Sequence, residues 1–282
     1  MKIEHRIRVY AACALSLLLA AAVSSCSASC DKAQCADSDD TDDTRVAFTT
    51  VSESETYTLP GTDSLFNSDK DAVFSAHASL IMPANVSNAN VTILREAIVK
   101  AATAGKVDVK SPEQTLKEYF KATAQSLGYP EVAKSDDDVD IMDADGFISI
   151  TGTIASMSPR ILSYAITEYL YPVHAANGQT TLTYVNYDFS DGKVMTLGDV
   201  FTPEGLKELP AVIAERAKET QPEAEITALP ASGSYYIDYE GRIVFVYEQG
   251  EVAARAAGAV SAAFYPQELM QYMTPAGREF LK

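Results

Sequence analysis

The side chains that could act as nucleophiles, general bases or metal ligands are few in this sequence. Downstream of residue 25 it contains two histidines, His77 and His174, and no cysteine follows Cys35. Neither a G-x-S-x-G nor an H-E-x-x-H motif occurs, and these patterns position a serine nucleophile or a pair of zinc ligands. We therefore expect no catalytic residue, no metal and no cofactor, and we expect that the protein is not an enzyme.

The two histidines lie in different kinds of segment. His77 lies in SAHASL, which alternates between small apolar and polar residues, so we expect an ordinary residue of a sheet. His174 lies in a loop after a long predicted strand, and it is the weak candidate for ligand binding.

Carboxylates are abundant, and six aspartates lie within residues 134–146. Asp143 and Asp145 would fit the third and fifth positions of an EF-hand calcium loop. The first and twelfth positions would then be Ile141 and Gly152, so the anchoring carboxylates are missing. A solvated loop is the better interpretation. Because acidic residues are so common, no pair stands out as the acid and base of a glycoside hydrolase.

The first 25 residues are typical of a signal peptide. Three basic side chains precede an apolar run over residues 11–23, which is too short to span a membrane. The run ends in the sequence VSSC, which resembles a bacterial lipobox and predicts that Cys26 carries the lipid anchor after cleavage. The alternative is an ordinary secretory signal followed by a coincidental cysteine.

Residues 26–45 are small, polar and acidic, so we expect a disordered tether between the lipid and the folded part. Such an acidic run resembles the export tag of some Bacteroidetes lipoproteins. The sequence therefore predicts an outer-membrane lipoprotein, at the periplasmic face or the cell surface. Cys30 and Cys35 lie in the tether, where they either form a small local disulfide or stay free.

The chain has a formal net charge of −17 at pH 7. Residues 1–25 carry three basic and one acidic side chain, so the remainder has 19 basic against 38 acidic residues, or −19. Nucleic acid and anionic lipid headgroups are therefore poor partners, whereas a cationic protein would be attracted. The alternative is that the acidic surface only keeps an exported protein soluble.

Periodicity predicts an α+β fold, with mainly antiparallel sheets and a few packed helices. The clearest helix follows Ser111 and Pro112, which suit a capping residue and a first-turn residue. A hairpin is expected around the Asp-Gly pair at 191–192, with its second strand running to Phe201. The other expected strands and helices cover residues 45–59, 72–82, 88–104, 147–157, 161–171, 204–220, 233–238, 242–248, 259–264 and 267–273.

A series of landmarks in the second half of the chain is similar to a known family. They are VNYDFSDGKVMTLGDVF, YYIDYEGRIVFVYEQGEVAARAAG and FYPQELMQYM. In this order they resemble the extracytoplasmic C-terminal domain family shared by the anti-sigma factor RsiV and the peptidoglycan deacetylase PdaC. His174 falls where that family often has a Gly-Ala-His turn, although Pro172 and Val173 replace the Gly-Ala here.

The resemblance implies two closely joined subdomains, a companion subdomain over residues 46–145 and the C-terminal domain over residues 146–282. It also implies an envelope binding module that recognises lysozyme or another cationic protein, or a cell-wall component such as peptidoglycan. The alternatives are a carboxylate-dependent hydrolase of cell-wall glycan and a structural lipoprotein without a soluble ligand. The sequence holds neither a sigma-binding segment nor a deacetylase domain that we can identify.

Tyrosines are concentrated in the second half of the chain. With their acidic neighbours they would suit a recognition face for a protein or a glycan, although β-propensity explains them equally well. Complete burial would favour the structural lipoprotein, whereas outward-facing tyrosines would favour recognition. The tyrosines in question are Tyr164, Tyr169, Tyr171, Tyr184, Tyr187, Tyr235, Tyr236, Tyr239, Tyr247, Tyr265 and Tyr272.

Overall fold

A computed structural model describes most of the chain after residue 45, and residues Thr44–Lys282 form one compact unit. No helix in the described part is both long and apolar enough to cross a membrane. The described residues are 46–64, 71–84, 89–129, 131–132, 144–173, 175–222, 226, 229 and 234–280.

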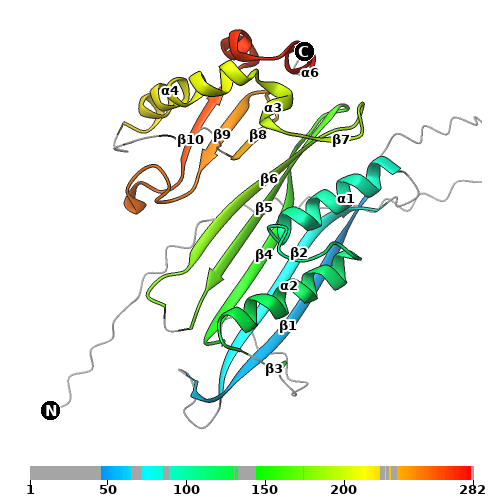
Figure 1. Ribbon diagram of the computed structural model, residues 1–282, viewed down its shortest axis with the longest axis vertical. Helices are drawn as coiled ribbons and strands as arrows, with labels where there is room; N and C mark the ends of the chain where they lie inside the picture. Colours follow the sequence, from blue (N-terminus) through cyan, green and yellow to red (C-terminus); the bar gives the residue numbers. More distant parts are fainter. Residues whose placement is uncertain are drawn as a thin grey trace, which may run out of the picture. The chain divides into compact units, whose positions relative to one another are not determined.

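A mixed seven-stranded sheet is the largest element of this unit (Figure 1). Its strands are β1 (Phe48–Asp63), β2 (Asp71–Pro83), β3 (Glu131–Val132), β4 (Gly146–Met157), β5 (Ile161–Tyr171), β6 (Gln179–Asp188) and β7 (Lys193–Met195). They lie in the order β3-β1-β2-β4-β5-β6-β7. β2 and β4 are parallel, and every other neighbouring pair is antiparallel.

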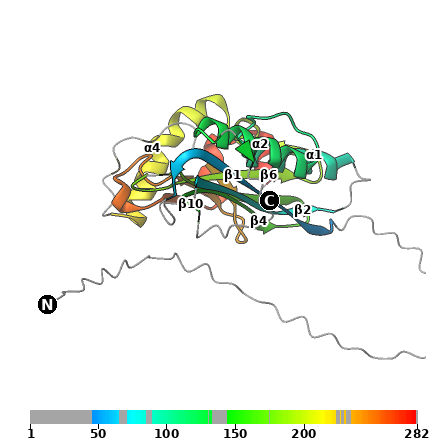
Figure 2. The same cartoon turned by 90° about the horizontal axis from the view of Figure 1, so that it is seen from below.

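Two helices, α1 (Ala89–Ala102) and α2 (Pro112–Ser126), cover one face of this sheet (Figure 1, Figure 2). Both were predicted from the sequence. The hydroxyl of Ser111 accepts a hydrogen bond from the first turn of α2, as its capping position requires. Leu94 of α1 and Phe120 of α2 are completely buried against the strands.

The strands under these helices alternate between an apolar and a polar face, because successive side chains of a strand point to opposite sides. On β2, Phe74 and Leu80 share a hydrophobic core with Leu94 of α1. His77 and Ser79 point to the opposite face, where His77 is half-buried and Ser79 is exposed. The helices therefore stabilise one face of the sheet and leave the polar one open over β1, β2 and β4.

A second layer is built on a three-stranded antiparallel sheet in the order β10-β9-β8. Its own core includes Ile213, Phe245 and Phe264. The elements of this layer are β8 (Ser234–Ile237), β9 (Ile243–Tyr247), β10 (Val260–Phe264), α3 (Leu197–Val200), α4 (Pro203–Thr220), α5 (Pro266–Leu269), α6 (Pro275–Phe280) and 3₁₀ turns at Arg255–Ala257 and Met270–Tyr272.

Buried hydrogen bonds join the second layer to the polar face of the large sheet at its β5–β6 end. The Ser163 hydroxyl donates to Asn186 Oδ1 at 2.6 Å, and the Asn186 amide donates to the carbonyl of Tyr235 at 2.8 Å. The backbone N–H of Ile237 donates to Ser163 Oγ at 2.9 Å, and the Ser156 hydroxyl donates to the Ile237 carbonyl. Buried polar groups need such partners, so these bonds fix where β8 lies on the sheet.

The hairpin around 191–192 is confirmed, since β6 pairs with β7 and Gly192 has a positive φ of 63°. The expectation that its second strand reaches Phe201 is wrong. β7 ends at Met195, and α3 follows because Asp199 accepts hydrogen bonds from the Thr196 N–H at 2.8 Å and hydroxyl at 2.6 Å. These bonds lower the pKa of Asp199, as does Lys193 at 3.0 Å.

The expected α+β class is confirmed, with the mainly antiparallel pairing that the sequence predicts. The subdomain boundary predicted between residues 145 and 146 falls inside the large sheet. There β2 and β4 pair from Phe74 with Gly146 to Leu80 with Gly152. The division of this chain into 46–145 and 146–282 stays a prediction.

Asp145, which the calcium-loop interpretation placed at a ligand position, makes hydrogen bonds within the fold. Its Oδ2 accepts from the Val73 N–H at 2.7 Å, and its Oδ1 accepts from the Ser64 hydroxyl at 3.0 Å. The residue is 1% exposed. Asp143 and Ile141 lie outside the described residues.

The stability of the helix layer can be tested at two neighbouring positions of α1. Leu94 is completely buried and Ile93 is 42% exposed. We expect Leu94→Ala to lower the free energy of unfolding by about 2 to 5 kcal/mol, because it removes buried methyl groups and leaves a cavity. Ile93→Ala, the matched control, is expected to stay within about 0.5 kcal/mol of the parent in urea unfolding. Equal losses at both positions would contradict this packing.

The contact between the two sheets predicts that the fold loses stability at high pH. Tyr184 stacks on Tyr236 at 4.8 Å between ring centroids, and burial, with a smaller contribution from Tyr236, raises the pKa of Tyr184 to about 12. A raised pKa favours the neutral phenol in the fold, so stability is lost as pH rises from about 10, the pKa of an unfolded tyrosine. In urea unfolding between pH 9 and 11.5, Tyr184→Phe should lose less stability than the parent. The 77% exposed Tyr239→Phe is the control, and an unchanged pH slope for Tyr184→Phe would disprove the expectation.

Candidate binding face

Of His77, His174 and Cys26, one lies in the described structure. His77 is on β2, in the sheet as predicted, whereas Cys26 and His174 lie outside the described residues. Within the described residues, no group of three or more His, Cys, Asp or Glu side chains is arranged to hold a metal ion.

His77 lies in a shallow depression on the open face of the large sheet, with a volume of about 310 Å³. The strands β1, β2 and β4 each contribute polar side chains to it. Glu53, Ala78 and Ile150 also line the depression. We call the serine, threonine and histidine side chains of this surface the hydroxyl face, and its members are Ser52, Ser54, His77, Ser79, Ser149 and Thr151. Most of them are exposed, and His77 and Ser149 are half-buried.

The strand register places these residues in rows that cross the sheet. One row, which we call the His77 row, runs from Ser54 through His77 and Ser149 to Tyr169 and Thr180, on five adjacent strands. Since neighbouring strands lie about 4.8 Å apart, the row is roughly 19 Å long. The next row contains Ser52, Ser79, Thr151, Thr167 and Leu182.

Neither row contains an Asp, Glu, Lys or Arg residue. Glu53 and Glu55, which alternate with the serines of β1, point to the helix-covered face. There Lys117 of α2 lies 3.5 Å from Glu53 and 3.9 Å from Glu55. The side chains of the hydroxyl face therefore offer hydrogen-bond donors and acceptors to a ligand, and none of these side chains carries a fixed charge.

His77 has one hydrogen-bond partner in the described structure, the hydroxyl of Ser75, with 3.0 Å between Ser75 Oγ and His77 Nε2. A serine nucleophile needs access to substrate and a base that is oriented by a third group. Ser75 is 1% exposed, and no carboxylate of the described residues hydrogen-bonds to the His77 ring. The pair therefore suits a fixed polar group on a binding surface better than a nucleophile and its base.

An aromatic cluster borders the hydroxyl face at the β4–β5 side. The Phe147 ring centroid lies 5.5 Å from that of Tyr169 and 5.9 Å from that of Tyr171, and all three side chains are half-buried. The Tyr171 hydroxyl donates to the Ala175 carbonyl at 2.9 Å. The backbone of Gly178 packs against the Tyr169 ring, since an added Cβ would lie 2.3 Å from Tyr169 Cζ. These contacts hold Tyr169 at its place in the His77 row.

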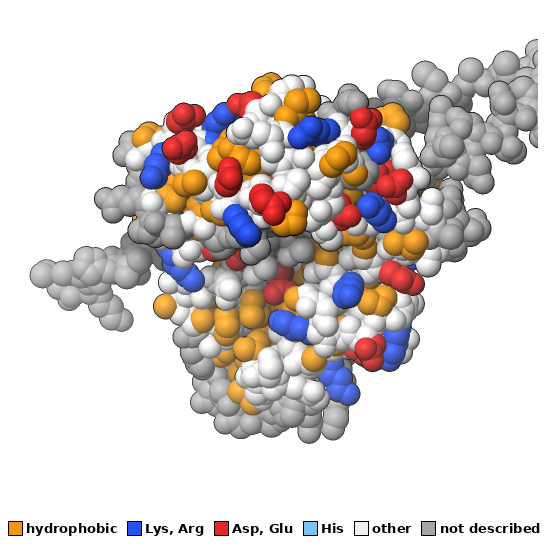
Figure 3. Space-filling model, turned by 45° about the horizontal axis from the view of Figure 1, so that its top comes forward, with side chains coloured by type: hydrophobic (Ala, Val, Ile, Leu, Met, Phe, Trp, Pro, Cys, Tyr) orange, Lys and Arg blue, Asp and Glu red, His pale blue; other side chains and the backbone are white. Residues whose placement is uncertain are grey.

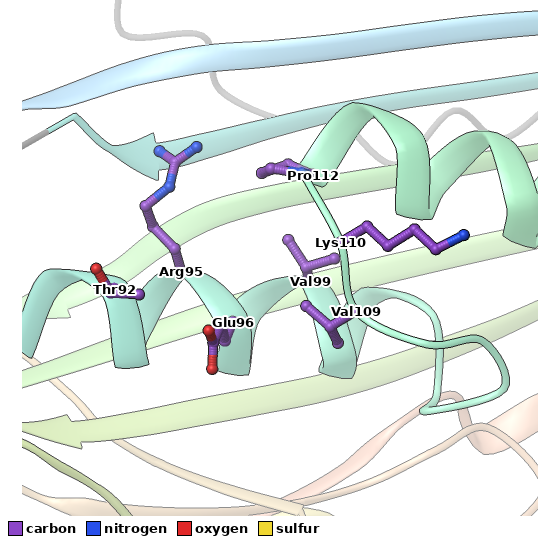
Figure 4. Close-up of a pocket in the computed structure, with 7 residues that line it drawn as sticks. All are labelled: Thr92, Arg95, Glu96, Val99, Val109, Lys110 and Pro112. Atoms are coloured by element: carbon purple, nitrogen blue, oxygen red, sulfur yellow. The ribbon is translucent and has the colours of Figure 1, made fainter. Parts of the chain in front are cut away.

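A second pocket, of about 160 Å³, lies between α1 and the segment that leads into α2 (Figure 4). Two basic residues line it, Arg95 and Lys110, and their side chains extend away from each other. The Arg95 guanidinium donates to the carbonyl of Pro83, and the Lys110 ammonium lies 2.5 Å from Glu118. Because both charges already have partners in the chain, this pocket is a weak candidate for an anion site.

The tyrosines of the second half of the chain divide between core and surface. Tyr239 is 77% exposed and Tyr265 is 49% exposed. Tyr164, Tyr187, Tyr235 and Tyr247 are buried, and Tyr169, Tyr171, Tyr184, Tyr236 and Tyr272 are half-buried. The complete burial that would have favoured a purely structural lipoprotein is not observed.

The hydroxyl face itself was missed in the sequence, although each strand carries its signal. Serine, threonine or histidine stands at every second position in the middle of each strand, over residues 50–58 of β1, 75–79 of β2 and 149–153 of β4. The polar residues of the three strands form one surface because β2 pairs with β4, and the central residues of these two strands are about 70 positions apart in the chain. That pairing could not be read from local patterns.

Comparison with solved structures shows which fold this is. A DUF3298 family protein from Bacteroides fragilis is 16% identical, with a TM-score of 0.62, and the match covers 84% of this chain and 97% of that chain. A DUF3298 family protein from Pseudomonas aeruginosa is 11% identical, with a TM-score of 0.49, over 82% and 96% of the two chains. No family model and no curated protein matches the sequence. The chain therefore has a fold similar to that of the Bacteroides fragilis DUF3298 family protein, whose family name denotes a domain of unknown function.

Proposed function

We propose that this protein is a lipid-anchored binding module of the bacterial envelope and that it binds a cell-wall component on the hydroxyl face. The signal peptide, the VSSC sequence at residues 23–26 and the acidic tether support the envelope location. The observation that carries the binding role is the exposed, uncharged series of hydroxyl groups around His77. We propose no catalytic step for this surface.

The resemblance to RsiV and PdaC suggests a cationic protein such as lysozyme as another ligand. The net charge of −17 would attract such a protein over a distance. On the face drawn in Figure 3, however, acidic and basic side chains are interspersed and form no continuous patch of one sign. The hydroxyl face has no charged residue in either of its two rows. A wall component is therefore the ligand that we favour.

A substitution at the predicted lipid-attachment residue tests the anchor. We expect cells that express the parent chain to incorporate labelled palmitate into it, because acyl chains on Cys26 hold the protein to the membrane. Cys26→Ser should remove the label, because serine has no thiol to receive the lipid. Cys30→Ser, four residues further along the tether, is the matched control and should stay labelled. Equal labelling of both variants would refute the assignment of Cys26.

Binding to the cell wall can be measured by sedimentation with purified peptidoglycan sacculi, using residues 44–282, which form one compact unit. Thr151→Glu adds a bulky charge to the hydroxyl face and should reduce the bound fraction at least about tenfold. Ser261→Glu makes a similar change at an exposed strand position of β10 and should bind as the parent does. Thermal unfolding should show both variants folded, because exposed substitutions change stability little.

The result that would overturn the proposal is failure of the parent chain to sediment with sacculi. Calorimetric titration with a lysozyme at two salt concentrations, with another basic protein of similar charge as control, then decides on the cationic ligand. Saturable binding of lysozyme alone would assign the protein to that class. Turnover of muropeptides, measured in the same preparations, would instead favour the carboxylate-dependent hydrolase.

A further inference from the structure

We infer that the ligand of the hydroxyl face is an uncharged, N-acetylated glycan strand that crosses the β-strands along the His77 row. This inference rests on the proposed function and specifies it, because it selects the sugar part of the wall over the peptide part. It also gives individual roles to Ser54, His77, Ser149 and Tyr169.

The chemistry of the His77 row matches the chemistry of a sugar chain. A hydroxyl group both donates and accepts hydrogen bonds, so Ser54, Ser149 and Thr180 can pair with sugar hydroxyls in either direction. The imidazole of His77 adds a donor or an acceptor near the middle of the row. Its position is fixed by the 3.0 Å contact with the buried Ser75 hydroxyl. A ligand with many hydroxyls therefore finds partners along the whole row.

Tyr169 supplies the apolar contact that hydroxyl groups cannot provide. A sugar ring has an apolar face of C–H groups, and an aromatic side chain with a polar tip packs well on such an amphipathic ligand. Tyr169 follows Ser149 directly in the row and lies against Phe147 at 5.5 Å. Because Gly178 also packs on the ring, Tyr169 is held in place before the ligand arrives. Such preorganisation reduces the entropy cost of binding.

The lack of charge in the row decides between acetylated and deacetylated sugars. A free amino group on the sugar would bring a positive charge to the face, and a buried charge needs an opposite partner. Neither row has a carboxylate among its own residues. Glu53 lines the depression, but its carboxylate and that of Glu55 lie near Lys117 on the other side of the sheet. At the β6 end of the second row, the Glu248 carboxylate already accepts a hydrogen bond from the Leu182 N–H at 2.8 Å. The acetamido group is neutral and needs only hydrogen bonds. The row should therefore prefer N-acetylated glycan in spite of the negative net charge of the protein.

The length of the row indicates a short oligosaccharide rather than a single sugar. Its five residues span roughly 19 Å across β1, β2, β4, β5 and β6. The depression of about 310 Å³ occupies the β1–β2–β4 part of the row, and the aromatic cluster follows on β4 and β5. Affinity should therefore rise with chain length until the row is filled.

The test is calorimetric titration of residues 44–282, the compact unit, with N-acetylglucosamine oligomers of increasing length and with the matching deacetylated oligomers. We expect acetylated oligomers to bind, longer ones to bind more tightly, and deacetylated ones to bind more weakly at physiological salt. His77→Ala and Tyr169→Leu should each weaken the acetylated oligomer about fivefold to tenfold, as expected for one lost hydrogen bond or aromatic contact. Ser261→Glu should have no effect, and thermal unfolding checks that each variant is folded.

The outcomes separate this inference from the proposed function. Binding to sacculi that Thr151→Glu abolishes, without binding of any oligomer, would keep the wall-binding function and overturn the glycan ligand in favour of the wall peptide. A preference for deacetylated oligomers would also overturn it, because charge attraction would then dominate. Failure to bind sacculi and oligomers alike would overturn both.

Discussion

The alternation of side chains along β1, β2 and β4 is the constraint on which the rest of this structure depends. Because neighbouring residues of a strand point to opposite faces, one sequence such as FSAHASL supplies both a core and a surface. Phe74 and Leu80 pack under α1 and α2, and His77 lies on the other side. A shift of register by one residue would exchange these faces and bury the hydroxyl groups. The stability of the core and the position of the candidate site are therefore set by the same pairing.

The second layer determines how much of the polar face stays open. It is fixed at the β5–β6 end by two hydrogen bonds: the Ile237 N–H of β8 donates to Ser163 Oγ, and the Asn186 amide donates to the Tyr235 carbonyl. Their burial makes each bond costly to lose, because an unpaired polar group remains inside the protein. The Tyr184–Tyr236 stack adds apolar contact at the same end. Over β1, β2 and β4 the hydroxyl groups remain available to a ligand.

Local patterns in the sequence were sufficient for most individual elements. Ser111 and Pro112 predicted the start of α2, and the Asp-Gly pair at 191–192 predicted the turn between β6 and β7. The predicted bounds of β5 agree with the observed Ile161–Tyr171. These features depend on residues within one turn or one strand, which explains why the sequence alone identified them.

Features that join segments far apart in the chain could not be predicted from local sequence patterns. The parallel pairing of β2 with β4 joins segments about 70 residues apart, and no local signal specifies it. The helical turn of α3 was mistaken for strand because Asp199 caps it through side-chain bonds that periodicity does not reveal. For the candidate site, the sequence pointed to His174, whereas the hydroxyl face emerges from three strands only when their register is known.

The most direct test of a ligand on the hydroxyl face is methyl NMR of threonine-labelled protein during titration with glycan fragments released from sacculi. Thr151, Thr167 and Thr180 lie in the two rows. Two threonines of the second layer serve as controls, Thr202 at the N-cap of α4 and Thr220 at its last residue. We predict shifts of the first three methyl signals that saturate together and follow one dissociation constant. Shifts confined to Thr202 and Thr220, with Thr151 unchanged, would contradict binding at this face.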